Sequence, residues 1–267
     1  MTPARYEDNW VTAMGATFPG EGRTVLRGRD VLNDLGQRRW MEFFVYAITG
    51  RESSDLARLI EGIWALSSSY PDPRLWNNRV AALAGTARST CALGAAAANA
   101  VSEATLYGLR TSRGALDFFY RADRQLRDSQ TLDSIIRAEL RRFRVVYGYG
   151  RPLVDTDERI SPLLQFGETL GLRDGRYIRL ALDIDNYFRQ SRYKYRINVS
   201  ALAAAFGADQ GLTPDEFYRL ATLSFSGGIF PCYGDARDKP EGSFFPLRTG
   251  RIDYRGAPER RWGGHEE

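Results

Sequence analysis

The segment VVYGYGRPLVDTDER, residues 145–159, brings together residue types that could hold a ligand. Two glycines bracket a tyrosine, and glycine lets a backbone turn sharply or approach a ligand closely. Arg151 follows at once, and a group of acids precedes Arg159. A guanidinium does not exchange protons near neutral pH, but as a fixed charge it can polarise a carbonyl or clamp an anion. The segment predicts a site for an anion or a carbonyl compound.

The same segment also has a purely structural interpretation. The glycines are common in surface loops, and Asp155 and Asp157 lie close enough in sequence to Arg159 to form a surface ion network with it. A second polar cluster, PDPRLWNNR at residues 71–79, interrupts a helical pattern beside a tryptophan. It predicts either ligand contacts or a capping turn in which Asp72 and Asn77 are the caps.

Composition limits the chemistry. The 267 residues suffice for one large domain or two modest ones, and the net charge of +4 comes from arginine far more than lysine. We see no dense basic run for nucleic acid and no apolar segment long enough to span a membrane. The two cysteines share no metal-ligand spacing, so we expect no metal, no disulfide framework and a cytoplasmic location. The one histidine, His265, lies in the terminal tail, which argues against histidine-dependent catalysis.

Hydrophobic periodicity of the helical kind runs along most of the chain. Ser53 or Ser54 is a suitable N-cap, Gly50 a suitable helix end, and Thr213 followed by Pro214 a suitable helix start. Strand signals are scarce, and only RTVLRG near the start predicts a short ribbon. The expected helices cover residues 38–50, 53–70, a buried alanine-rich hairpin within 77–108, 115–128, 129–143, 161–171, 175–191, 200–210 and 213–228.

Several stretches, in order along nearly the whole chain, resemble the citrate synthase family, whose members condense acetyl-CoA with oxaloacetate. LYGLRT at 106–111 resembles "LHGLAN", VVYGYGRPL resembles "VVPGYGHAVL", and DTDER at 155–159 resembles "KTDPR". INVSALAAAFG at 197–207 resembles "NVDxHSGxLLxxxG", and the tail PLRTGRIDYRGAPERR at 246–261 resembles "RPRxxYxGPxxR". Each motif is weak alone, and their shared order carries the resemblance.

The resemblance implies an all-α homodimer. Residues 1–108 and 216–267 would form a large dimerisation domain, and residues 109–215 a small domain that closes over the substrates. A CoA thioester would bind as a substrate, and no metal is implied. The residues implied to contact CoA are Val146, Tyr147, Gly148, Tyr149 and Gly150 in the loop, and Arg192, Lys194 and Arg196 near its phosphates.

The positions that the resemblance makes catalytic depart from the family pattern. Tyr107 stands for the histidine of "LHG", Arg151 for the histidine of "GYGH", and Ser200 for the aspartate of "NVD". Tyrosine is a weak general acid at its usual pKa near 10, and a serine without a base partner does not remove a proton from carbon. Phe225 replaces a carboxylate-binding arginine, whereas the arginine of "DPR" is kept as Arg159.

Replacements for the lost groups are available nearby. Asp72 is the best candidate for a base, and the further candidates for substrate contacts are Arg74, Asn78 and Arg248. Glu103 lies four residues before Tyr107, so a shared helix face would let the two interact, although a salt bridge from Glu103 to an arginine is the simpler expectation.

Three functions stay open at this point. The chain is a repurposed enzyme that forms or cleaves a carbon–carbon bond in a thioester, a non-catalytic relative that binds CoA or an organic acid as a sensor or partner subunit, or a structural protein that kept the fold. An enzyme predicts loss of turnover in Asp72→Asn or Arg151→Ala with the fold intact. A sensor predicts saturable binding without a product.

Overall fold

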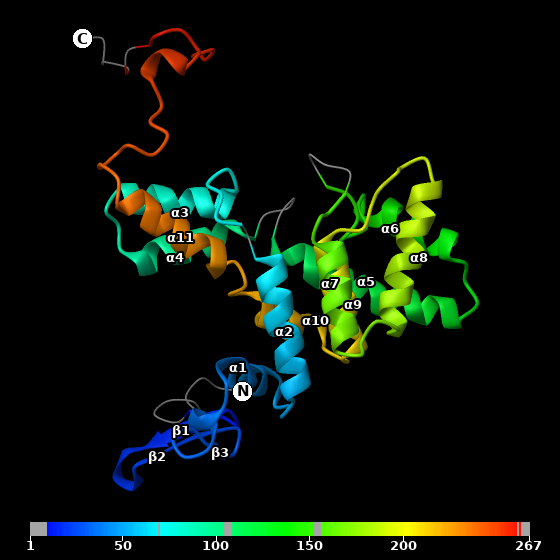
Figure 1. Cartoon of the computed structure of the whole chain (residues 1–267). Helices are drawn as coiled ribbons and strands as arrows, with labels where there is room; N and C mark the ends of the chain where they lie inside the picture. The colour runs from blue at the N-terminus through cyan, green and yellow to red at the C-terminus, as the bar shows by residue number, and fades with distance from the viewer. Residues whose placement is uncertain (1–9, 69, 104–107, 152–155, 261, 263–267) are drawn as a thin grey trace.

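The computed structural model describes residues 10–68, 70–103, 108–151, 156–260 and 262. The chain is mostly helical, as the sequence predicts, with one small sheet near the N-terminus (Figure 1). No helix in these ranges is both long enough and apolar enough to cross a membrane. The helices are α1 (Trp40–Thr49), α2 (Ser54–Ser67), α3 (Trp76–Thr86), α4 (Cys91–Val101), α5 (Leu109–Arg127), α6 (Leu132–Phe143), α7 (Ile160–Thr169), α8 (Arg176–Gln190), α9 (Val199–Asp209), α10 (Pro214–Ala221) and α11 (Ser226–Arg237).

The predicted ribbon is the central strand of a three-stranded antiparallel sheet. Its strands are β1 (Gly15–Phe18), β2 (Arg23–Leu26) and β3 (Arg29–Asp30), paired in the order β1-β2-β3. Arg27 follows β2 and donates from Nε to the carbonyl of Ala47 at 3.0 Å. This bond attaches the sheet to the C-terminal turn of α1, where the carbonyls lack partners within the helix.

Local signals placed the first two helices correctly. Gly50 ends α1 in the left-handed conformation, with φ of 74°, which a glycine adopts without strain. The Ser53 side chain accepts a hydrogen bond from the N–H of Leu56 and so caps α2. At the other end of the chain, Thr213 and Glu216 form a capping box at the start of α10.

Helices α3, α4 and α11 form a separate unit at one end of the molecule (Figure 1). Gly85 of α3 lies so close to α11 that a Cβ there would be 2.4 Å from the carbonyl oxygen of Tyr233. The predicted hairpin of α3 and α4 is present. The prediction that the hairpin is buried is wrong for α4 within one chain, because its outer face is open and Leu93 is 65% exposed.

The single helix predicted at 213–228 is also wrong. It divides into α10 and α11, and residues 222–225 form turns in which the N–H of Ser224 bonds to the carbonyl of Ala221 at 2.9 Å. The apolar periodicity continues across these turns while the backbone changes direction. The break lets α10 pack on α5 and α11 pack on α3.

The main hydrophobic core surrounds α9. This alanine-rich helix is buried on all sides among α5, α7 and α8, and Phe206 on it faces Gly167 of α7. The core also takes in Val45 of α1 and Leu56 of α2, so it joins helices from both of the domains that the sequence suggested. A second cluster holds α3, α4 and α11 together. The division at 109 and 215 stays a prediction.

Asp209 at the C-terminal end of α9 caps the N-terminus of α8. Its carboxylate accepts hydrogen bonds from the N–H of Tyr177 at 2.9 Å and of Ile178 at 3.1 Å. Gly175 precedes α8, and a Cβ at Gly175 would be 1.9 Å from this carboxylate. The cap therefore fixes the relative position of two helices that flank the candidate site.

We expect Asp209→Ala to lower the free energy of unfolding by about 1–2 kcal/mol, because two N–H groups at a helix start lose their acceptor. Urea unfolding followed by circular dichroism measures this. Asp235→Ala is the matched control, since it removes an exposed helical aspartate paired with Lys239 and is expected to change the free energy by about 0.5 kcal/mol or less. Equal effects of the two substitutions would contradict the capping role.

Candidate functional site

The loop VVYGYG is pinned to the segment that precedes α9. The N–H of Gly150 donates to the carbonyl of Arg196 at 2.7 Å, and the N–H of Asn198 donates to the carbonyl of Gly148 at 2.9 Å. The side-chain amide of Asn198 donates to the carbonyl of Gly150 at 3.0 Å. Two segments about fifty residues apart in sequence are thereby held side by side at the start of α9.

The glycines are required by this close approach. Gly148 and Gly150 have φ of 87° and 92°, a region that other residues rarely adopt. A Cβ on Gly148 would be 2.4 Å from the Cβ of Ala201 on α9. The loop backbone therefore lies directly on the first turn of α9.

The tyrosine between these glycines faces the protein interior. The hydroxyl of Tyr149 donates to the carbonyl of Ala181 at 2.9 Å, and burial raises the pKa of Tyr149 well above its usual value. Val146 is 1% exposed. Of the side chains expected to contact a nucleotide, these two instead support the loop, while Tyr147 is half-buried over Gly114 of α5. A ligand at this loop would meet mainly backbone.

Asp157 is the centre of a buried ion cluster. Nε and Nη2 of Arg159 each donate to one of its carboxylate oxygens at 2.8 Å. The N–H of Val199, the first residue of α9, donates to the same carboxylate at 2.8 Å. The Asp157 side chain is fully buried, so the expectation of a surface network is wrong for Asp157, and Asp155 lies outside the described residues. Bidentate pairing and the helix N-terminus together stabilise this charge away from water.

Burial by itself raises the pKa of the Asp157 carboxyl, but hydrogen bonds and the charge of Arg159, with the N–H of Val199, hold it below its usual value. The guanidinium of Arg159 is affected by the same pair. Burial lowers its pKa, and the bonds to Asp157 raise it to a net value above the usual one. Both groups are therefore charged near neutral pH.

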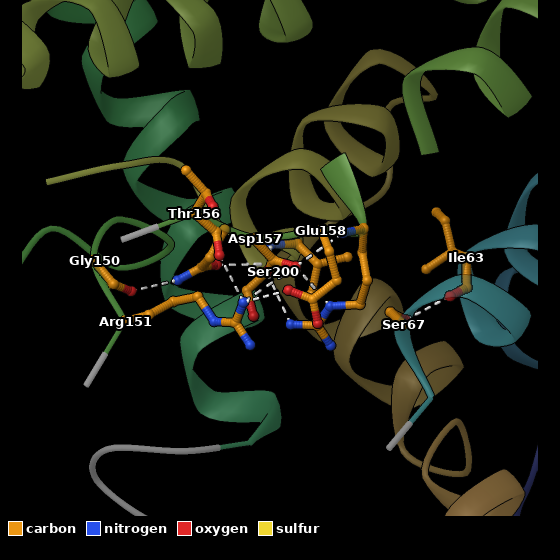
Figure 2. A network of polar contacts seen from close by, with 11 residues as sticks. Ile63, Ser67, Gly150, Arg151, Thr156, Asp157, Glu158 and Ser200 are labelled. Atoms are coloured by element: carbon orange, nitrogen blue, oxygen red, sulfur yellow. Dashed lines mark hydrogen bonds and ion pairs between the residues drawn. The ribbon is translucent and has the colours of Figure 1, made fainter. Parts of the chain in front are cut away.

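Arg151 lies beside this cluster (Figure 2). Its Nη1 donates to the carbonyl of Thr156 at 2.9 Å and to a carboxylate oxygen of Glu158 at 2.7 Å, and is 3.8 Å from Asp157. A backbone hydrogen bond and the bond from Arg151 hold the pKa of Glu158 below its usual value. Burial raises the pKa of Tyr70, and a hydrogen bond to Glu158 contributes in the same direction.

Ser200 lies on the first turn of α9, next to the residue that bonds to Asp157 (Figure 2). Its hydroxyl is 3.1 Å from the hydroxyl of Thr111 on α5, which itself donates to the carbonyl of Gly108 at 2.6 Å. The structure thus brings Arg151, Arg159 and Ser200 together from three places in the sequence. The bonds found for Ser200 within the described ranges link it to hydroxyl, amide and backbone groups rather than to a base.

The candidate base Asp72 forms an ion pair within its own turn. Its carboxylate accepts three side-chain bonds from Arg74, the shortest at 2.6 Å, and one from the N–H of Arg74. These bonds lower the pKa of Asp72. The alternative of a capping turn is met in part, since Leu75 is the N-cap residue of α3, while Asp72 accepts the N–H of Arg74 and Asn77 accepts the N–H of Asn78 at 2.9 Å. Asn78 is buried and donates to the carbonyls of Tyr70 and Asp72.

Other predicted positions lie elsewhere. Tyr107 is outside the described residues. The interaction of Glu103 with Tyr107 therefore stays a prediction, although α4 already ends at Val101. Within the described ranges Glu103 forms no salt bridge and instead accepts a hydrogen bond from the Tyr218 hydroxyl at 2.8 Å. Phe225 is the N-cap residue of α11. Arg248 lies in the exposed C-terminal tail, which extends away from α5–α9 (Figure 1).

The three basic residues before α9 are exposed or half-buried and make mostly local bonds. Arg192 donates to the Tyr193 hydroxyl at 3.0 Å, and Lys194 donates to the carbonyl of Arg189 at 3.0 Å. Arg196 is 3.4 Å from the buried carboxylate of Asp185, which also accepts the N–H of Ile197 at 2.7 Å. Asp185 was not singled out from the sequence, since a charged residue on an amphipathic helix normally faces water. Here it holds the basic segment in place.

Comparison with solved structures identifies the fold. The chain superposes on citryl-CoA lyase from Hydrogenobacter thermophilus with a TM-score of 0.80 and 17% identity, over 95% of this chain and 97% of the other. It matches ATP citrate lyase from Methanosaeta concilii, solved with (3S)-citryl-CoA, with a TM-score of 0.72 and 13% identity, over 94% of this chain and 42% of the other.

It also matches citrate synthase from Thermoplasma acidophilum, solved with carboxymethyl-CoA and oxaloacetate, with a TM-score of 0.65 and 15% identity, over 86% of this chain and 60% of the other. At the level of sequence, no family model and no curated protein matches the chain. The resemblance seen in the motifs is therefore confirmed as a shared citrate-synthase-like fold.

The buried position of Asp157 predicts a specific pH dependence. A carboxyl whose pKa is lower in the folded state stabilises the fold above its unfolded-state pKa, and this contribution is lost as the pH falls through the lowered, folded-state pKa. We expect Asp157→Asn to lower the free energy of unfolding by about 3–5 kcal/mol at pH 7, because it leaves Arg159 buried without its partner. The difference in free energy of unfolding between this variant and the unsubstituted protein should shrink as the pH falls below 3.8.

Guanidinium chloride unfolding at a series of pH values measures this difference. Asp133→Asn is the matched control, because Asp133 pairs with Arg137 on an exposed helix face and its loss is expected to cost about 1 kcal/mol or less. A difference for Asp157→Asn that stays constant between pH 7 and strongly acidic solution would contradict the assignment.

Proposed function

We propose that this chain binds a CoA thioester and a small organic acid, and that it forms or cleaves a carbon–carbon bond between them. The observation that carries the proposal is the likeness to citryl-CoA lyase along nearly the full length of both chains, combined with a glycine loop held on the start of α9. Two proteins of the same fold are described as complexes with CoA or citryl-CoA compounds, which supports a thioester as the ligand class.

Each proposed role is taken from the motif position that the residue occupies. The backbone of residues 146–150 lies against the nucleotide, and Arg192, Lys194 and Arg196 meet its phosphates as cationic donors. Arg159 and Arg151 orient the organic acid and stabilise negative charge on a reacting oxygen. Tyr107 donates a hydrogen bond to the enol oxygen of the thioester, and Ser200 orients a ligand group at the start of α9.

Asp72 is the proposed proton acceptor. It is ionised at neutral pH, as a base must be, and the bonds from Arg74 hold its pKa below the usual value, which makes it a weaker base. The remaining proposed contacts with the organic acid come from Arg74 in the same turn, from Asn78 in the first turn of α3, and from Phe225 as an apolar wall. Arg248 also stays a proposed contact, although the tail that carries it extends away from α5–α9 within one chain (Figure 1).

A specific observation favours a second function, that of a non-catalytic relative that binds the same ligands as a sensor or partner subunit. Ser200 occupies the position where the resemblance places an aspartate, and its hydroxyl pairs with that of Thr111 rather than with a titratable group. Loss of one acid–base group reduces rates by about 10²–10⁴-fold. In this alternative, ligand binding is saturable and no product forms.

Calorimetric titration with CoA and with acetyl-CoA, each with and without oxaloacetate, tests the shared part of both functions. We expect micromolar binding that weakens as salt increases, because phosphates meet cationic side chains. Lys194→Gln should weaken CoA binding about 5–10-fold. Lys239→Gln is the matched control, because Lys239 pairs with Asp235 on the exposed surface at the end of α11, and it should leave CoA binding unchanged.

Absence of CoA binding at millimolar ligand would overturn the proposal. If CoA binds, product analysis by mass spectrometry after incubation with citryl-CoA, or with acetyl-CoA and oxaloacetate, separates the enzyme from the non-catalytic relative.

The homodimer is likewise a proposal. Large apolar side chains are exposed on the unit of α3, α4 and α11, at Leu83, Leu93 and Phe230, with exposed fractions of 47%, 65% and 48%. We expect this face to be covered by a second copy, because burial of such residues is favourable by about 25 cal/mol per Å² of apolar surface.

Sedimentation velocity tests the dimer. The unsubstituted chain should sediment as a dimer, and Leu93→Glu as a monomer with unchanged circular dichroism, because a buried unpaired charge at an interface is costly. Asp117→Lys, on α5 and outside this face, is the control. A monomeric unsubstituted chain at micromolar concentration would contradict the proposal.

A further inference from the structure

Two departures from the resembled motifs meet in space. Arg151 replaces the final residue of "GYGH", and Glu158 replaces the proline of "DPR". The structure joins them, since Nη1 of Arg151 donates to Oε2 of Glu158 at 2.7 Å (Figure 2). A cation and an anion introduced at two motif positions are therefore partners in a single pair.

The pair changes the charge available to a ligand. Arg159 is already matched by Asp157, which takes two of its donors. Arg151 is matched by Glu158 through a single donor, Nη1, so the cluster of two guanidiniums and two carboxylates carries no net charge. An incoming carboxylate therefore finds no unmatched cation among these four groups.

The two carboxylates differ in how firmly they are held. Asp157 is fully buried and bonded by a guanidinium and a helix N-terminus, so its removal from Arg159 would leave a buried charge. The Glu158 side chain is 57% exposed, and water can solvate it once it leaves Arg151. Glu158 is the group that a ligand can displace or must avoid.

We propose that Glu158 determines specificity, acting as an internal carboxylate that occupies Arg151 and favours a neutral carbonyl or hydroxyl group there over a carboxylate. Within the described ranges, the hydrogen bonds of Arg151 all use Nη1, which leaves its Nε and Nη2 to donate to a carbonyl oxygen. The Glu158 carboxylate accepts from a hydroxyl on the same ligand. The inference rests on the proposed organic-acid site.

A ligand carboxylate at Arg151 would lie next to that of Glu158. Two like charges within about 4–6 Å repel each other strongly enough to shift a pKa by about one unit or more. The same free energy corresponds to about a tenfold change in the affinity for the ligand. Glu158→Gln keeps the shape and the hydrogen-bonding atoms of the side chain while removing its charge. It should therefore raise the affinity for a dicarboxylate about tenfold.

Titration calorimetry with oxaloacetate and with pyruvate, which lacks the second carboxylate, tests this in the full chain. Glu158→Gln should bind oxaloacetate about tenfold more tightly than the unsubstituted protein does. The variant should also show a stronger preference for oxaloacetate over pyruvate. Glu158→Asp keeps the charge and should bind like the unsubstituted protein. Glu168→Gln is the matched control, because Glu168 pairs with Arg173 at the same 2.7 Å and is 55% exposed.

CoA titration of the same variants separates this inference from the proposed function. A higher affinity of Glu158→Gln for oxaloacetate, without CoA binding, would support the role of Glu158 and overturn the thioester site. CoA binding with unchanged or weaker oxaloacetate binding in Glu158→Gln would overturn the inference alone. An equal gain in Glu158→Asp, or no oxaloacetate binding in any variant, would also overturn it.

Discussion

The buried carboxylate of Asp157 organises the candidate site because it serves three segments at once. It neutralises Arg159 at the start of α7, accepts the first N–H of α9, and lies 3.8 Å from Arg151 on the glycine loop. Each of these groups would be costly to leave unpaired at this depth. The glycine loop is also hydrogen-bonded to Arg196 and Asn198. The loop backbone and the charged side chains of the cluster are therefore both fixed relative to α9. The rest of the site is built around this helix start.

Much of the fold followed from local rules. Ser53, Gly50 and Thr213 marked helix ends that the structure confirms, since capping depends on a few neighbouring residues. Periodicity failed between α10 and α11, where an apolar pattern continues across a change of direction that tertiary packing imposes. It also placed the start of α5 six residues late, at 115 instead of Leu109, because polar residues occupy its first turns.

The candidate site was only partly predictable. The GYG loop and the pairing of Asp157 with Arg159 were visible as motifs. Burial of that pair, and the bond between Arg151 and Glu158, depend on segments that the sequence alone does not place together. Glu103 illustrates the same limit, because its hydrogen bond comes from Tyr218 of α10, which is 115 residues away in sequence. Asp185 was overlooked because its environment is set by the segment before α9, which folds back over it. Charge partners, unlike caps, are decided by the whole fold.

Helix α9 has a consequence for how such a protein can be altered. It is rich in alanine and buried on all sides, and Gly148 rests on Ala201 with no room for an added methyl group. Interiors of this density accept little change in volume. New ligand preferences would therefore have to arise in the surrounding loops, at positions such as 151 and 158, while the sequence of α9 stays constant. A library for laboratory evolution of this chain should keep α9 unchanged and vary the segments that lie against its first turn.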